Sequence, residues 1–353
     1  KAVSETVEAK TPAQAVEQTI CRLLAYAGEN TRAAMTIDAV GCRVVHGGAR
    51  FVEPTRVTPS VLDELRALGG LAPLHNPVDV AVLEQVKRSL PETPVMAVFD
   101  TEFHRTLPPV AYTYALPFEL CARYGLRRYG FHGISHAYVS RQLIGHLGHG
   151  AGGTKVVTCH LGNGASVCAV ADGRSVDIST GFTPLEGLVM GTRSGDVDPG
   201  LILYLIRAVG MTASEVDRLL NRESGLRGLS GLSGDIRDVE QAALEGNKHA
   251  ELALAVFAYR TRKYIGAFAA ALAGLDAVTF TGGIGEHSAS MRSRICQRLE
   301  FLGLRLEEDR NKTANGRAAM QISAESSPVQ IWVIPTDEEQ EIARSTVEQF
   351  RDR

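Results

Sequence analysis

The sequence has no apolar run that approaches the roughly 20 residues a helix needs to cross a bilayer. The longest candidate, Ala267 to Leu275, is short and is followed by Asp276. The first residues, Lys1 to Glu5, show neither the apolar core of a signal peptide nor an arginine-rich amphipathic pattern. We therefore expect a cytoplasmic protein with no membrane partner.

The sequence also lacks the cysteine spacings of a disulfide framework or a zinc site. Its six cysteines are scattered, no pair is spaced as Cys-x-x-Cys, and most lie among apolar residues. We expect reduced cysteines in the core. His132 and His136 could form a metal-binding pair four residues apart, but Gly130 and Gly133 disfavour a stable helix there and no His-Glu-x-x-His is present.

Positive charge is not in excess either. The formal net charge is −3, so the surface as a whole does not favour a polyanion, and we expect no nucleic-acid partner. Hydrophobic residues make up 44% and charged residues 22%, which is ordinary for a globular protein. A chain of 353 residues is long for a single core, which favours two domains.

Two glycine-rich segments each follow an apolar β-type run. Lys155 to Cys159 leads into His160 to Ser166, and Ala277 to Thr281 leads into Gly282 to Glu286, with a helix expected from near Ser288. Glycine lets backbone N–H groups surround phosphate oxygens because no Cβ blocks them. One such loop could equally be a tight turn, but the two together indicate nucleotide binding.

The remaining elements are expected from periodicity and from proline and glycine positions. Asp100 follows one of the apolar runs, at the strand end where open α/β sheets bind ligands. The predicted strands are Ala39 to Val45, Pro94 to Phe99, Val167 to Val170 and Val329 to Pro335, and the predicted helices start at Pro12, Val61, Ala250 and Asp337.

Two arginines occupy unusual surroundings. Arg43 lies inside an apolar strand, where a guanidinium is costly unless it is paired or faces an anion. Arg193 lies in a polar segment between Gly191 and Gly195. Arg43 alone could form a structural salt bridge, but two arginines beside phosphate-binding loops fit phosphoryl transfer.

Further polar candidates stand in glycine-rich or helix-starting positions. His132 lies between Phe131 and Gly133, a setting more typical of a residue exposed to a cleft than of a core histidine. Asp235 lies in a glycine and serine loop. Glu338 opens the last helix, where it could also simply complement the helix dipole.

In this order, these segments closely resemble the acetate kinase family of the acetate and sugar kinase/Hsp70/actin superfamily, from about residue 12 to the end. The resemblance implies two ribonuclease-H-like (actin-like ATPase) α/β domains flanking an interdomain cleft: residues 1–102 plus 337–353, and a nucleotide-binding domain of residues 103–336. The matching segments are 44–48, 73–77, 99–101 with 103–104, 128–133, 160–164, 181–187, 190–196, 231–238, 283–286, and 334–336 with 338–339.

The resemblance also implies a reaction and the residues that serve it: reversible transfer of the ATP γ-phosphoryl group to acetate, giving acetyl phosphate and ADP, in a homodimer that uses Mg²⁺ (or Mn²⁺). The implied roles are catalysis by Asp100, His132 and Arg193; substrate binding by Arg43, Val45, Leu74, His75, Phe131 and Pro184; ATP binding by His160, Leu161, Gly162, Asn163, Gly164, Asp235, Ile236, Arg237, Gly283, Ile284, Gly285, Glu286 and His287; and metal binding by Glu338.

One implied role conflicts with elementary chemistry. The family gives Asp100 an acid/base function, yet a carboxylate substrate with a pKa near that of Glu, about 4.3, is already ionised at neutral pH. We therefore expect Asp100 to orient Arg43 or a metal-bound water.

The sequence departs from the family pattern in three places. It lacks the N-terminal Asn-x-Gly-Ser-Ser-Ser loop, which we expect to precede Lys1 in the working protein, and it has His287 and Asp337 where relatives usually have Asn. Two alternatives stay open: a propionate kinase, and a catalytically inactive nucleotide-binding homologue. Valine at position 45, where propionate-preferring relatives tend to have alanine, favours acetate.

Overall fold

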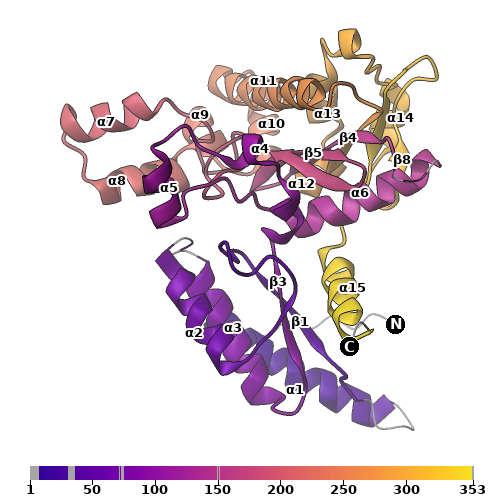
Figure 1. Ribbon diagram of the computed structural model, residues 1–353. Coiled ribbons are helices and arrows are strands. Elements are labelled where there is room, and N and C mark those ends of the chain that lie inside the picture. The colour runs from indigo at the N-terminus through magenta and orange to yellow at the C-terminus, as the bar shows by residue number, and fades with distance from the viewer. Residues whose placement is uncertain are drawn as a thin grey trace. The chain divides into compact units, whose positions relative to one another are not determined.

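The computed structural model describes residues 8–30, 36–70, 72, 75–148, 150 and 152–351 (Figure 1). The chain divides into two compact units, unit 1 of residues 1–102 and 338–353 and unit 2 of residues 103–337. The predicted boundaries place residue 337 in the first domain rather than the second.

Unit 1 is built around a three-stranded sheet of order β1-β3-β2. Strands β1 (Val40–Val44) and β3 (Val95–Phe99) are parallel, and β2 (Thr55–Arg56) is antiparallel to β3. All five residues of β3 are buried, as its apolar sequence predicts for a central strand. The helices of this unit are α1 (Pro12–Asn30), α2 (Pro59–Ala67), α3 (Asn76–Ser89) and α15 (Glu338–Arg351).

The C-terminal helix α15 returns to unit 1 and packs on β1. This close packing requires a glycine on the strand. A Cβ at Gly41 would lie 2.4 Å from Thr346 Oγ1 and 2.6 Å from Ile342 Cγ2. The C-terminal helix therefore belongs to the same compact unit as the first 102 residues.

Unit 2 holds a six-stranded sheet of order β6-β5-β4-β7-β9-β8. Its first three strands form an antiparallel meander, and β4, β7 and β9 are parallel. A hairpin turn at Asp172 and Gly173, both with positive φ, joins β5 to β6. The strands are β4 (Lys155–Leu161), β5 (Ala165–Ala171), β6 (Arg174–Ile178), β7 (Ala277–Thr281), β8 (Met320–Gln321) and β9 (Gln330–Val333).

Helices cover both faces of this sheet because alternate strand residues are apolar on both sides. Val157 packs in one cluster with Phe257 of α11 (Lys248–Ala271), whereas Val156 packs in the other with Leu143 of α6 (Gly133–Leu147). The other helices of unit 2 are α4 (Pro109–Tyr112), α5 (Phe118–Tyr124), α7 (Pro199–Arg207), α8 (Ala213–Arg218), α9 (Gly225–Ser230), α10 (Ile236–Leu244), α12 (Gly282–His287), α13 (Ala289–Cys296) and α14 (Glu308–Thr313).

One predicted element is wrong. The segment after β7 is the short helix α12, which begins at Gly282, and not a loop. Gly282 adopts a φ of +75° that turns the chain directly out of the strand, and the Glu286 carboxylate accepts a hydrogen bond of 2.8 Å from the Gly282 N–H. This side chain closes the first turn of the helix, and the helix predicted from Ser288 follows as α13.

All six cysteines are free, but only Cys159, Cys168 and Cys296 are buried; Cys42 and Cys121 are half-buried and Cys21 is exposed, so the expected core location holds for three of them. Among the described residues, no helix is both long enough and apolar enough to span a membrane. In the same part of the chain, no cluster of three or more His, Cys, Asp or Glu side chains is arranged to hold a metal ion.

Candidate active site

The predicted phosphate loop between β4 and β5 is a tight turn in which the Gly162 N–H donates to the Gly164 carbonyl at 2.9 Å. The segment around Gly191 packs directly on this turn, with the Gly191 N–H donating to the Asn163 carbonyl at 2.9 Å. A Cβ at Gly191 would lie 2.1 Å from Asn163 Oδ1 and 3.0 Å from the Gly234 carbonyl. Glycine at 191 therefore lets three predicted loops meet backbone to backbone.

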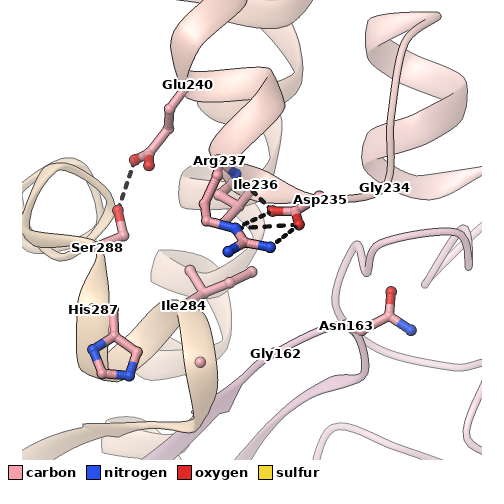
Figure 2. A pocket seen from close by; sticks show the side chains of 11 residues that line it. Gly162, Asn163, Gly234, Asp235, Ile236, Arg237, Glu240, Ile284, His287 and Ser288 are labelled. Atoms are coloured by element: carbon pink, nitrogen blue, oxygen red, sulfur yellow. Dashed lines mark hydrogen bonds and ion pairs between the residues drawn. The ribbon is translucent and has the colours of Figure 1, made fainter.

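A cavity of about 600 Å³ opens beside these loops, a volume typical of small-molecule sites (Figure 2). It gathers residues from all three predicted nucleotide segments, which are far apart in the sequence. Its lining consists of Gly162, Asn163, Gly234, Asp235, Ile236, Arg237, Glu240, Gly283, Ile284, His287 and Ser288.

Polar side chains on this lining are held by one another, as Figure 2 shows. Asp235 caps α10 by accepting from the Arg237 N–H at 2.9 Å, and its carboxylate also binds the Arg237 guanidinium, with Nη2 to Oδ2 at 2.5 Å. These hydrogen bonds lower the pKa of Asp235 to about 2. Ser288 donates to Glu240 at 2.6 Å, so the far side of the cavity is also fixed.

Five residues predicted to bind ATP do not line the cavity. Two of them have visible structural tasks. Glu286 holds the first turn of α12, and the ring of His160 shares a hydrogen bond of 2.8 Å with Ser135. The five residues are His160, Leu161, Gly164, Gly285 and Glu286.

His132 and Arg193 both reach the glycine turn at Gly164. A methyl group placed on the Gly164 Cα would lie 3.0 Å from His132 Nε2 and 3.7 Å from Arg193 Nη1. His132 stands at the start of α6 with φ 57° and ψ 25°, a left-handed conformation that costs a non-glycine residue about 1–2 kcal/mol. Such local strain is found mainly at functional positions.

Arg193 has no acidic partner among the residues that the structure describes. Its Nη1 donates to the Pro184 carbonyl at 3.1 Å and lies 3.7 Å from Met190 Sδ, both neutral groups. Burial lowers the pKa of this guanidinium. A half-buried cation without a counter-charge favours binding of an anion.

In unit 1, Arg43 on β1 pairs with Asp100, the residue that follows β3. Arg43 Nη2 lies 2.5 Å from Asp100 Oδ2, and Nε lies 3.1 Å from both carboxylate oxygens. The Asp100 side chain is 2% exposed and that of Arg43 is 44% exposed. The charge of Asp100 is the main reason that the pKa of Arg43 is raised.

Two further carboxylates lie close to this pair. Asp79 accepts from the Val45 N–H at 2.9 Å, and Glu338 begins α15. Burial raises the pKa of both groups, the negative charge of Asp100 raises them further, and Arg43 lowers them. Sequence reasoning missed Asp79, although a carboxylate in the first turn of the helix after His75 was a visible signal.

This excess of carboxylate oxygens fits a magnesium ion. Mg²⁺ prefers oxygen ligands and is usually bound by one or two carboxylates together with substrate phosphates. Such a site needs no complete cage of protein ligands, which agrees with the lack of one among the described side chains.

The residues predicted to hold the acyl group are divided between the units. Val45 in unit 1 and Phe131 in unit 2 are buried, and Pro184 in unit 2 is half-buried. His75 directly precedes α3 in unit 1. Leu74 lies outside the described residues.

Known proteins match this chain over most of its length. A family profile described as the Acetokinase family matches residues 1–344. The chain is 51% identical over 310 residues to a Heliobacterium modesticaldum protein named acetate kinase, which covers 88% of this chain and 77% of that protein.

Solved structures agree with the sequence matches. The crystal structure of Porphyromonas gingivalis acetate kinase has a TM-score of 0.87 at 42% identity, covering 94% of this chain and 84% of that one. A propionate kinase from Francisella tularensis has a TM-score of 0.86 at 39% identity over the same shares. The predicted α/β fold class is confirmed, and the chain belongs to the acetokinase family.

Proposed function

We propose that this protein is an acetate kinase that reversibly transfers the γ-phosphoryl group of ATP to acetate, giving acetyl phosphate and ADP. The observation that carries the proposal is the Arg193 guanidinium, which has no acidic partner among the described residues and reaches Gly164 together with His132 Nε2. A cation and a ring nitrogen at one glycine turn, beside a cavity large enough for a nucleotide, suit a phosphoryl group in transfer.

The mechanism is direct in-line attack of the carboxylate oxygen on the γ-phosphorus. The attacking group is already ionised at neutral pH, so no base has to remove a proton. The protein contributes alignment of the reactants and cancellation of charge on the phosphoryl oxygens. Arg193 supplies the positive charge and His132 a hydrogen bond to a phosphoryl oxygen. The nucleotide is held by the Gly162–Gly164 turn together with Asp235, Ile236, Arg237, Gly283, Ile284 and His287.

Arg43 binds the substrate carboxylate or the phosphoryl group, and Asp100 orients it. The short contact between Arg43 Nη2 and the buried Asp100 supports this role for Asp100. Asp100 binds Nε and Nη2 of Arg43 and so fixes the direction in which the remaining N–H groups of the guanidinium point. His75 and Val45 complete the acyl side in unit 1.

Mg²⁺ (or Mn²⁺) is the metal of the proposal, with Glu338 among its ligands. The ion supplies positive charge that neutralises the phosphate oxygens of the nucleotide. The raised pKa values of Glu338 and Asp79 support a site that gains stability when a cation is bound beside these carboxylates.

Propionate is the second candidate substrate, because a propionate kinase is among the similar solved structures. Val45 favours the smaller acid, since its side chain is larger than the alanine we associate with propionate preference. A pocket of this kind discriminates one methylene by about 1–3 kcal/mol. Propionate is therefore a poorer substrate rather than an excluded one.

A homodimer in the cytoplasm completes the proposal. Helix α7 exposes apolar side chains around its surface, which supports a subunit contact there. The six free cysteines are in keeping with a reducing compartment.

Trapping acyl phosphate as its hydroxamate tests the proposal. Protein incubated with ATP, MgCl₂ and acetate should yield acetyl hydroxamate after addition of hydroxylamine, and ADP in equal amount. Release of ADP without hydroxamate, with acetate and with propionate, would contradict carboxylate phosphorylation. Butyrate serves as the size control.

A further inference from the structure

A continuous chain of hydrogen bonds runs from β4 to His132 through the interior of unit 2. Thr158 Oγ1 lies 2.7 Å from His136 Nδ1, and His136 Nε2 lies 2.8 Å from Ser166 Oγ. Ser166 Oγ lies 2.8 Å from His132 Nδ1. The chain therefore links β4, β5 and α6, the three elements that hold the glycine turn and His132.

The central histidine of this chain is neutral. His136 is fully buried, and burial lowers its pKa well below the usual range, with the neighbouring His104 and His160 adding to the effect. A neutral imidazole has one nitrogen that donates and one that accepts. The two hydrogen bonds of His136 must therefore run in the same direction along the chain.

The Thr158 hydroxyl fixes that direction. It is fully buried, and among the described residues its sole hydrogen-bond partner is His136 Nδ1. If Nδ1–H donated to Thr158, the hydroxyl proton would be buried without an acceptor, whereas the reverse leaves only lone pairs unmatched. Orphaned buried donors are the rarer and costlier case. Thr158 therefore donates to Nδ1, and His136 carries its proton on Nε2.

The directions of the remaining hydrogen bonds follow because each hydroxyl group has one proton to donate. His136 Nε2–H donates to Ser166 Oγ, which leaves the Ser166 proton to donate to His132 Nδ1. A neutral His132 must then carry its own proton on Nε2. This nitrogen faces Gly164, the residue that the Arg193 guanidinium also reaches.

We propose that Ser166 and His136 are positioning residues that fix the tautomer of His132, so that a neutral imidazole donates its Nε2–H to a phosphoryl oxygen. This inference rests on the proposed function for its catalytic meaning, but the tautomer itself does not. The donor needs no positive charge on His132 and keeps the second nitrogen occupied inside the protein. The hydrogen-bond chain therefore makes His132 a donor of a hydrogen bond rather than an acid that could lose its proton to the substrate.

The direct test is ¹⁵N NMR of the wild-type chain labelled at histidine, because protonated and unprotonated ring nitrogens have well-separated chemical shifts. The His132→Gln and His136→Gln variants each lose the signals of one ring and so assign the two sets of signals. At pH 7.5 both rings should carry one proton, on Nε2, with Nδ1 acting as an acceptor. A proton on Nδ1 of His132, or protons on both nitrogens, would overturn the inference.

Kinetics supply the second arm. Ser166→Ala should lower kcat on the order of tenfold, as the loss of an outer partner of a functional histidine does, and leave KM for ATP and acetate within about twofold. Ser175→Ala is the matched control: Ser175 is equally buried and bonds His104 Nδ1 at 2.8 Å, so its kcat should stay at the wild-type value. Equal losses of kcat in both variants would reduce Ser166 to a packing role.

The two ideas can fail separately. If the wild type forms no acyl phosphate with any short carboxylate, the proposed function fails while the NMR result still decides the tautomer. If the wild type is active and His132 carries its proton on Nδ1, the tautomer inference fails alone.

Discussion

At the scale of single residues, three buried or half-buried arginines of unit 2 differ in what offsets their charge. Arg128 forms an ion pair with Glu186 at 2.5 Å. Arg292 is fully buried and donates to four backbone carbonyls and to Asn311 Oδ1, which holds the end of α12 in place. Arg193 has neither arrangement, since its hydrogen-bond partners in the described part of the chain are one carbonyl oxygen and one sulfur. It is the arginine with donors left for a ligand.

Replacement of Arg193 should therefore affect turnover more than folding. Arg193→Ala removes a preorganised donor, and losses of one such donor cost on the order of 10²-fold in kcat. Steady-state assays with acetate and ATP measure the change. Arg294→Ala is the control, because Arg294 pairs with Glu251 on the exposed side of α13 and should retain full turnover. A loss below about threefold for Arg193→Ala would make it a structural residue.

Val45 is the residue on which substrate choice depends. Val45→Ala should raise kcat/KM for propionate relative to acetate by about 5- to 150-fold, the equivalent of 1–3 kcal/mol for the removed steric conflict. Competition between the two acids in one assay, with the acyl hydroxamates separated by chromatography, gives the ratio directly. An unchanged ratio would show that Val45 does not contact the acyl chain.

At the scale of elements, the ends of β1 and β3 and the start of α15 bring Arg43, Asp79, Asp100 and Glu338 together in unit 1. Parallel strands end at the same sheet edge, so β1 and β3 place Arg43 and Asp100 side by side. Asp100 contacts the Arg43 guanidinium directly, and the charges of Asp79 and Glu338 act on it from nearby. Burial is the main reason that the pKa values of Asp79 and Glu338 are raised, and the negative charge of Asp100 adds to the rise.

This cluster makes stability depend on pH in a defined sense. The folded pKa values of Asp79 and Glu338 are raised, so between their unfolded and folded values the folded state binds more protons. Their contribution to stability is therefore lost as pH rises from about 4 through the folded pKa values. Urea unfolding at several pH values should show a flatter profile for Glu338→Gln than for the wild type. MgCl₂ with ATP should offset the loss in the wild type and much less in the variant.

The elements also show what sequence reasoning can reach. Strand β7 matches its prediction at both ends because its apolar run is bounded by Asp276 and Gly282. The helix α12 was missed, since three glycines among its six residues disfavour a helix and the Glu286 side chain that closes it acts only in the folded chain. Asp79 was missed because its partner, the Val45 N–H, is 34 residues away in sequence.

At the scale of the whole molecule, the chain crosses between the units twice, after Glu102 and after Asp337. Each crossing is within two residues of a proposed site residue, Asp100 or Glu338. Candidate site residues could be named from the sequence because each motif has its own local signature. The hydrogen-bond chain behind His132 could not, because Thr158, His136 and Ser166 become neighbours only when β4, β5 and α6 pack together.

We expect the proposed homodimer to form through helix α7. A helix that is apolar on every side is normally buried, yet Leu201, Leu203 and Tyr204 of α7 are 46%, 48% and 60% exposed. Val209, just beyond the helix, is 56% exposed. A second copy of the chain that covers this face would remove these side chains from water.

Sedimentation equilibrium tests this assignment. The wild type should sediment at twice the mass of the 37.9 kDa chain, and Leu203→Glu with Tyr204→Glu should convert it to a monomer by placing two charges on the covered face. Leu244→Glu is the matched control, because Leu244 is 84% exposed at the end of α10 and away from α7 in sequence. A dimer that survives both changes at α7 would place the subunit contact on another surface. Loss of the dimer in the Leu244 variant would mean that added charge alone, rather than the α7 face, controls association.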